Sequence, residues 1–168
     1  MGTVTTKPLI KRMKLSRLLL EGPGHSFGPA YHGGTWDGKK PIRVNGKGAL
    51  GVGAYFTPIH SKAYQYAKES GGQTIAAYLD INKPLVIHAS QYEHPCVQAL
   101  VLLGVNEEKA SKLVERVEEK YGYLGSEIKN LAMKQGYDGI FEYFNNNLTE
   151  IVVWNAAQVK PITEQDKM

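Results

Sequence analysis

The chain has 168 residues, about one domain's worth, and its 42% of hydrophobic residues suffice for one packed core. Its apolar runs are far shorter than the roughly 20 residues that cross a bilayer, so we expect no membrane segment. The single cysteine, Cys96, excludes an internal disulfide and a cysteine-based zinc cluster, and it favours a reducing, cytoplasmic setting.

The net charge of +4 comes from the N-terminal segment. Five basic residues precede the first acidic one, Glu21, whereas 15 basic residues face 16 acidic ones beyond residue 17. A nucleic-acid-binding face over the whole chain is therefore not indicated. We expect a basic leader and linker over 1–28 and a single domain over 29–168. The glycines and prolines over 21–29 predict a loop there. The leader is a solvated segment, a contact for an acidic partner or a targeting segment.

An aromatic strand and a helix stand out in the first half of the expected domain. After a short strand over 30–32 and loop-like sequence over 36–49, the pattern predicts a strand over 54–57. A helix follows, which Ser61 caps and Gly71 or Gly72 ends.

Tyr55 and Tyr66 lie eleven residues apart, on this strand and this helix. A strand, a tight turn and a helix can direct two such rings into one cleft, where they would grip a flat ring. Tyrosines are also common core residues that bury a ring and hydrogen-bond a hydroxyl. From the residues alone, both interpretations stay open.

The run 46–51 matches the dinucleotide-binding pattern G-x-G-x-x-G. That fingerprint follows a strand, opens a helix and has an acidic residue about twenty positions on. Here a strand pattern comes after Gly51, and position 71 is glycine. We therefore expect no Rossmann turn.

The second half mixes strands and helices without regular alternation. Strands are expected over 73–81, 84–87, 137–144, 150–154 and 159–162, and helices over 97–103, 107–121 and 126–136. The asparagine turn at 145–147 joins two of the strands into a hairpin. Strands that surround helices in this way indicate an α+β class with a largely antiparallel sheet or split barrel.

Three separated motifs can be set side by side: Tyr31-His32-Gly33, Gly53-Ala54-Tyr55-Phe56-Thr57, and the string 149–160 that contains Glu150. Together they resemble the His-Tyr-Glu class of ADP-ribosyltransferases, the poly(ADP-ribose) polymerase-like class, and its small phage and bacterial members. The resemblance runs in the family's order over 30–162. It implies the ADP-ribosyltransferase-like fold, with two small, mostly antiparallel sheets around an NAD cleft and an inserted helical segment.

The resemblance also implies how NAD, the co-substrate, would be held. His32 would hydrogen-bond the adenosine ribose, and the backbone of Gly33 would clamp the nicotinamide carboxamide. Tyr66 would stack on the nicotinamide ring, while Tyr55 would line the opposite wall and help to hold its ribose. A hydroxyl residue usually follows the His-Gly pair, but here Gly34 does, so that bond to the carboxamide is either lost or supplied by Thr35.

Glu150 would be catalytic, together with His32 and Tyr55. Cleavage between ribose C1 and nicotinamide passes through an oxocarbenium-like state, so positive charge develops on the sugar. A carboxylate that accepts the ribose 2-hydroxyl would stabilise that charge by about 3 kcal/mol. No metal is required. Without the resemblance, a residue such as His32 is more often a core or surface histidine than a ligand, and Glu150 is more often an exposed charge.

The expected function is NAD-dependent mono-ADP-ribosylation of a macromolecule, either protein or nucleic acid. Leu148 stands where the arginine-specific branch carries Glu or Gln, so arginine is not the expected acceptor. The alternatives are an NAD glycohydrolase toxin and a non-catalytic module that binds NAD or ADP-ribose. We expect a cytoplasmic monomer that acts as a phage effector or toxin, with no membrane partner and no metal.

Overall fold

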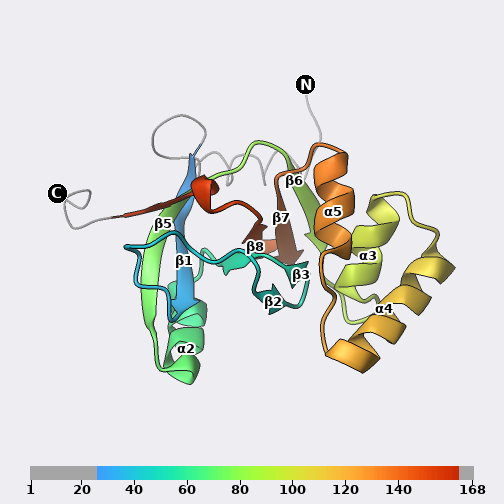
Figure 1. Ribbon diagram of the computed structural model, residues 1–168, viewed down its shortest axis with the longest axis horizontal. Helices are drawn as coiled ribbons and strands as arrows, with labels where there is room; N and C mark the ends of the chain where they lie inside the picture. The colour runs from blue at the N-terminus through green and yellow to red at the C-terminus, as the bar shows by residue number, and fades with distance from the viewer. Residues whose placement is uncertain (1–25, 163–168) are drawn as a thin grey trace.

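The computed structural model describes residues 26–162, so almost all of the predicted basic leader lies outside the described residues. Of the three sheets in these residues, the two larger lie side by side, with helix α2 next to one and helices α3, α4 and α5 on the outer side of the other (Figure 1). None of the helices in the described range is long and apolar enough to cross a membrane. The predicted α+β class with an inserted helical segment is confirmed.

The first sheet has the order β1-β5-β9 and is antiparallel throughout. Its strands are β1 (Ser26–Gly34), β5 (Gln73–Asp80) and β9 (Val159–Pro161). The prediction of a loop up to residue 29 was wrong, because β1 already begins at Ser26. The register shifts between Phe27 and Ala30, so a bulge takes in the glycine and the proline that suggested a loop.

The second sheet has the order β4-β8-β7-β6. Its strands are β4 (Ala54–Phe56), β8 (Asn147–Val153), β7 (Gly139–Phe144) and β6 (Pro84–His88). The pair β6 and β7 is parallel, unlike the others. The helices between these two strands carry the chain back across the sheet, and such a crossover connection produces a parallel neighbour.

The hairpin between β7 and β8 turns on two asparagines. Asn145 and Asn146 have φ angles of 51° and 65°, a conformation that asparagine tolerates and that two-residue hairpin turns require. Asn147 is already part of β8. Glu150 therefore lies in the middle of a strand, where the sequence had suggested its beginning.

Helix α2 (His60–Ser70) begins two residues earlier than a cap at Ser61 predicts. Ser61 is not its cap: Ile59 occupies the N-cap position and makes no side-chain cap hydrogen bond. The hydroxyl of Thr57 accepts instead from the backbone N–H of Ile59, at 3.1 Å. Gly71 ends the helix as predicted, with a left-handed φ of 70°.

The inserted helices are α3 (Pro95–Leu102), α4 (Glu107–Tyr121) and α5 (Glu127–Lys134). α3 starts earlier than predicted because Pro95 suits the first helical position and the His94 side chain caps it. Ser126 stands at the predicted N-cap of α5 but makes no side-chain cap hydrogen bond.

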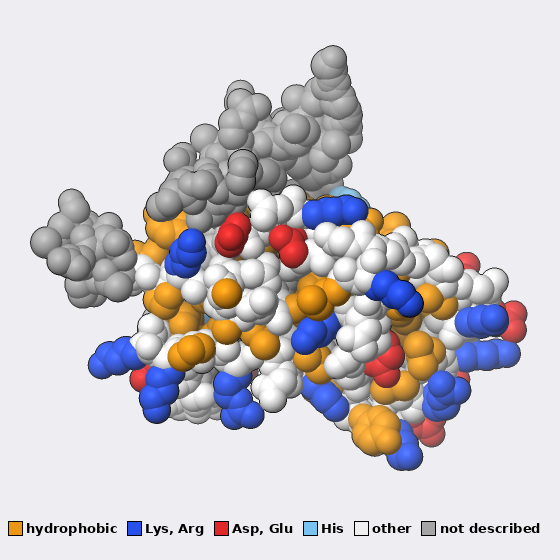
Figure 2. All heavy atoms as spheres, turned by 45° about the horizontal axis from the view of Figure 1, so that its top comes forward, with side chains coloured by type: hydrophobic (Ala, Val, Ile, Leu, Met, Phe, Trp, Pro, Cys, Tyr) orange, Lys and Arg blue, Asp and Glu red, His pale blue; other side chains and the backbone are white. Residues whose placement is uncertain are grey.

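Strand β8 separates two hydrophobic cores. Val152 packs in the core between the second sheet and the inserted helices, whereas Ile151 and Val153 pack in the core shared by the two sheets. Side chains alternate between the faces of a strand, so Glu150 shares its face with Val152. The face drawn in Figure 2 intersperses basic side chains with apolar and acidic ones, as the nearly balanced charge beyond residue 17 predicts.

Candidate active site

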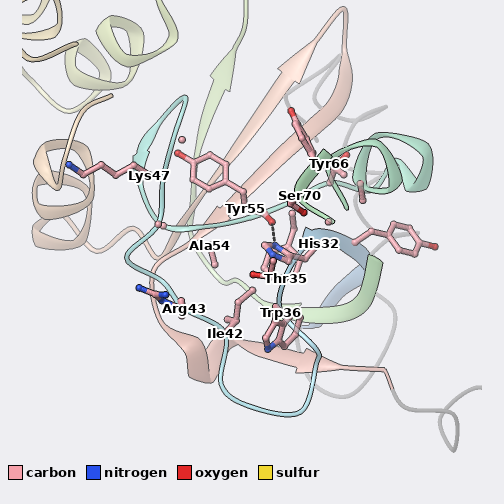
Figure 3. Close-up of a pocket in the computed structure, with 18 of the residues that line it drawn as sticks. His32, Thr35, Trp36, Ile42, Arg43, Lys47, Ala54, Tyr55, Tyr66 and Ser70 are labelled. Atoms are coloured by element: carbon pink, nitrogen blue, oxygen red, sulfur yellow. Dashed lines mark hydrogen bonds between the residues drawn. The ribbon is translucent and has the colours of Figure 1, made fainter. Parts of the chain in front are cut away.

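A cavity of about 1130 Å³ is lined by residues of both sheets and of α2. Its lining includes every site residue expected from the sequence: His32, Gly33, Thr35, Tyr55, Tyr66 and Glu150. Figure 3 shows four of them, His32, Thr35, Tyr55 and Tyr66, around the same space. Five come from β1, α2 and the chain between them, and Glu150 comes from β8, far along the sequence.

Strand β1 and helix α2 make an unusually close contact at Gly33. A Cβ atom at this position would collide with the backbone carbonyl of Ala63 in α2. A Cβ at Gly34 would lie 3.0 Å from Nε2 of His32. Gly34 thus leaves room for the His32 ring, which gives a physical reason for the missing hydroxyl residue at this position.

His32 is tied to the second sheet. Its Nδ1 lies 2.8 Å from the carbonyl oxygen of Tyr55, and since a carbonyl only accepts, Nδ1 carries the proton (Figure 3). Burial lowers the pKa of His32, and the bond to Tyr55 opposes that effect. The ring is therefore neutral, and Nε2 keeps a lone pair that can accept a hydroxyl proton. Two backbone hydrogen bonds between Tyr31 and Thr57, of 2.8 and 2.9 Å, hold the strands in this position.

The hydroxyl of Tyr55 is bound within the protein. It donates to the carbonyl of Gly51 at 2.6 Å and accepts from the N–H of Leu50 at 2.9 Å. Burial raises the pKa of Tyr55, so the hydroxyl stays protonated. Tyr55 therefore offers the cavity its ring and not a free hydroxyl.

These contacts explain the G-x-G-x-x-G run, which forms the hairpin of β2 (Lys47–Gly48) and β3 (Gly51–Val52). A Cβ at Gly48 would lie 2.6 Å from the Tyr55 ring, and Gly51 adopts a φ of 88°. The interpretation against a Rossmann turn is confirmed. The glycines let the hairpin close over Tyr55.

Tyr66 approaches the cavity from α2 (Figure 3). Its side chain is 46% exposed, in contrast to the half-buried Tyr55. Burial raises the pKa of Tyr66, and the negative charge of Glu150 adds to the effect. One wall of the cavity is therefore the ring of Tyr55, which hydrogen bonds hold in place, and the other is the exposed ring of Tyr66 on α2.

A β-bulge sets the position of Glu150. Glu142 of β7 pairs with Glu150, but the next pair is Tyr143 with Leu148, so Thr149 is an extra residue in β8. The Thr149 hydroxyl donates to the carbonyl of Glu142 at 3.1 Å. Bulges often redirect a side chain at a functional site.

Lys62 of α2 supports this arrangement. Its Nζ donates to the carbonyl of Thr149 at 3.2 Å and lies 4.0 Å from Oε2 of Glu150. The Glu150 side chain is only 12% exposed, and burial raises its pKa to about 7. The Lys62 charge lowers that pKa, and the Glu142 charge raises it.

Sequence reasoning missed Glu142. An unbroken two-residue hairpin would place it opposite Thr149, and only the bulge brings it opposite Glu150. Lys62 also had no role in the site expected from the sequence. Lys62 could have been identified from its position four residues before Tyr66, because residues four apart lie on the same face of a helix.

Basic side chains also line the cavity, namely Lys40, Arg43 and Lys47. In Figure 3, Arg43 and Lys47 lie on the other side of Tyr55 from Tyr66. Guanidinium and ammonium groups are suited to bind phosphate oxygens. The cavity thus combines aromatic walls, a buried carboxylate and cations, and the cations are site residues that the sequence motifs did not indicate.

A second grouping of polar residues, His94, Cys96 and Glu118, has ligand atoms within 4.8 Å of one another. His94 Nδ1 accepts from the backbone N–H of Cys96 at 3.0 Å, so Nε2 carries the proton that it donates to Glu118 at 2.8 Å. A neutral ring bonded in this way has no lone pair left for a metal. The three side chains lie close together because His94 caps the N-terminus of α3 and also binds Glu118.

The sequence was also compared with families and with known proteins. A family model described as "ADP-Ribosyltransferase in polyvalent proteins" matches residues 28–168. A solved structure, "Crystal structure of an anti-CRISPR protein", is 20% identical, with 79% of this chain and 93% of that chain covered and a TM-score of 0.40. No curated protein matches the chain. The family match contains every residue that lines the cavity.

Proposed function

The chain belongs to the family of ADP-ribosyltransferases in polyvalent proteins, and on this basis we propose that it is an NAD-dependent mono-ADP-ribosyltransferase with a macromolecular acceptor. The observation that carries the proposal is the convergence of His32, Tyr55 and Glu150 on one cavity. The volume of about 1130 Å³ is slightly above that of ordinary ligand pockets, about 300–1,000 Å³, which suits a ligand as large as a dinucleotide.

In the proposed complex, nicotinamide lies between the rings of Tyr55 and Tyr66, with its carboxamide on the backbone of Gly33 and on Thr35. The Nε2 lone pair of His32 accepts a hydroxyl proton of the adenosine ribose. Support comes from the neutral state of His32 and from its bond to Tyr55, which orients the ring.

The diphosphate of NAD needs cations, and Lys40, Arg43 and Lys47 line the same cavity. Arg43 and Lys47 lie away from Tyr66, where the diphosphate would extend from the nicotinamide pocket (Figure 3). We propose that these side chains bind its phosphate oxygens.

In the proposed reaction, Glu150 accepts a hydrogen bond from the ribose 2-hydroxyl next to the reacting C1. As the C1–N bond breaks, its electron pair stays on the nicotinamide nitrogen, which leaves neutral. The ionised carboxylate stabilises the positive charge that develops on the ribose. Lys62 keeps Glu150 in place through Thr149, and an acceptor group then forms the new bond at C1.

The activity of the free enzyme is expected to rise with pH through about 7, where Glu150 ionises. The carboxylate is the active form, so kcat/KM should fall about tenfold per pH unit on the acidic side. Removal of the Lys62 charge in Lys62→Met should move the midpoint to higher pH, because that charge lowers the pKa of Glu150. A pH profile of nicotinamide release measures both effects, and a flat profile between about pH 5.5 and 8 would contradict the assignment.

The function itself is tested with NAD that carries one label on nicotinamide and another on the adenylate. The wild-type protein should release nicotinamide and attach the adenylate label to macromolecules of a cell lysate. Free ADP-ribose without labelled macromolecules would identify a glycohydrolase. Binding of NAD in calorimetry without nicotinamide release would identify a non-catalytic module.

We further propose that the protein works as a cytoplasmic monomer, as an effector or toxin inside a host cell. The cytoplasmic setting is supported by Cys96, a free and buried thiol whose pKa burial raises to about 12. Such a thiol is inert, so this cysteine serves packing and not redox chemistry.

A further inference from the structure

Two carboxylates face each other next to the cavity. Glu142 and Glu150 are directly opposite in the antiparallel register of β7 and β8, and therefore lie on the same face of the sheet. Side chains in such a pair have Cβ atoms about 5 Å apart, and like charges there are destabilising. Lys62 lowers the pKa of both groups, but burial has the larger effect and raises both. Such an unfavourable arrangement indicates a functional site.

Glu142 lies on the other side of Glu150 from Tyr55. The strand order β4-β8-β7 places Glu150 between Tyr55 and Glu142. Glu150 lines the cavity, whereas Glu142 is not part of its lining. A nucleotide held between Tyr55 and Glu150 would therefore leave Glu142 beyond the reacting ribose.

Among the described residues, no group forms a hydrogen bond or an ion pair with the Glu142 carboxylate. Its backbone carbonyl accepts from the Thr149 hydroxyl, but its carboxylate has no hydrogen-bond partner within residues 26–162. Glu118, by comparison, is bound to His94. A carboxylate that is half-buried and unbound is free to take a proton.

We propose that Glu142 is the general base that takes the proton from the acceptor, and that the attacking group of the acceptor is an uncharged hydroxyl. The inference rests on the proposed transferase function. The hydroxyl oxygen bonds to ribose C1, and its proton passes to the Glu142 carboxylate. The electrons of the C1–N bond leave with nicotinamide, so charges and atoms balance.

The acidic pair also selects against other acceptors. A carboxylate or a phosphate is already an anion, needs no base, and would be repelled by Glu142 and Glu150. A hydroxyl is a weak nucleophile until its proton is removed, so it gains most from a base at this place. The charges at the site therefore favour a hydroxyl of a protein side chain over a carboxylate.

The test uses methanol and azide as small acceptors with the full-length protein and NAD. Methanol needs a base, whereas azide is an anion without a proton. In Glu142→Ala and Glu142→Gln, formation of methyl ADP-riboside should fall about 100-fold, with NAD affinity within about twofold of wild type. Added azide should restore turnover in Glu142→Ala and yield ADP-ribosyl azide. Glu119→Gln removes an exposed carboxylate of α4 and should behave as wild type.

The results separate the inference from the proposed function. Unchanged methanol transfer in Glu142 variants of an active enzyme would overturn the role of Glu142 alone, as would a failure of azide to restore turnover in a variant that binds NAD. Release of no nicotinamide by the wild-type protein would overturn both.

The chemical class of the acceptor is tested in labelled lysate. Neutral hydroxylamine should leave the label in place, and protease should remove it from the macromolecular fraction. Loss of label on treatment with hydroxylamine would reveal carboxylate esters, and loss on treatment with ribonuclease would reveal a nucleic-acid acceptor. Either result would overturn the inference that the acceptor is a hydroxyl of a protein side chain.

Discussion

Glu150→Gln is expected to lower the rate of nicotinamide release about 100- to 1000-fold while NAD stays bound. Glutamine keeps the size of the side chain and an oxygen that accepts the ribose hydroxyl. It lacks the negative charge, which matters only when positive charge develops on the ribose. The interaction is thus lost in the transition state and retained in the ground state, so kcat falls and the Kd of NAD changes little.

Glu150→Gln should also keep the fold. Glu150 is 12% exposed and burial raises its pKa, so the native state holds an unfavourable charge above about pH 7 that the variant lacks. Thermal unfolding at about pH 8 should show a melting temperature at or above that of wild type. Glu119→Gln is the matched control for the loss of one carboxylate. A variant that is stable, binds NAD and keeps more than about a tenth of the wild-type rate would mean that Glu150 is not the catalytic carboxylate.

Gly33→Ala is expected to destabilise the protein by about 3 kcal/mol or more, which is a fall of about 10 °C in melting temperature for a domain of this size. The new Cβ would collide with the backbone carbonyl of Ala63, and a backbone atom cannot turn away as a side chain can. β1 and α2 must move apart, which separates His32 from Tyr66 across the cavity. Urea unfolding measures the loss, and calorimetry with NAD should show weaker binding in any folded fraction.

Gly46→Ala is the matched control for this substitution. A Cβ at Gly46 would have its nearest contact at 3.7 Å, with the carbonyl of Gly53, which is an ordinary van der Waals distance. Its unfolding free energy should stay within about 1 kcal/mol of wild type. Equal unfolding free energies of the two variants would show that β1 and α2 can move apart at little cost, and that Gly33 is not required for packing.

Much of the site could be predicted from the sequence. The motifs around His32, Tyr55 and Glu150 are short and local, and each sits where its own strand or helix signal is strong. All six predicted residues line the cavity. The strand, turn and helix in succession direct Tyr55 and Tyr66 into it, and the resemblance to the family indicated the other four. The roles of these residues in NAD binding and catalysis remain predictions.

The errors have local causes. Ser61 has the right chemistry for a cap, but Thr57 and the preceding turn start α2 earlier. The loop predicted up to residue 29 is a strand, because the buried Phe27 and the pairing with β5 outweigh the turn preference of Gly28 and Pro29.

By itself, the sequence determined the α+β class, the order of the elements and the chemical groups of the site, since these depend on local patterns of apolar residues, turn formers and motifs. Only the tertiary structure decided how those groups pair. The bulge at Thr149 turns Glu150 toward Glu142 and frees a carbonyl for Lys62. A one-residue shift in register reverses which face a side chain occupies, and it leaves little trace in the sequence. The acidic pair, with the raised pKa of Glu150 and the base that we propose, is therefore a property of the folded sheet.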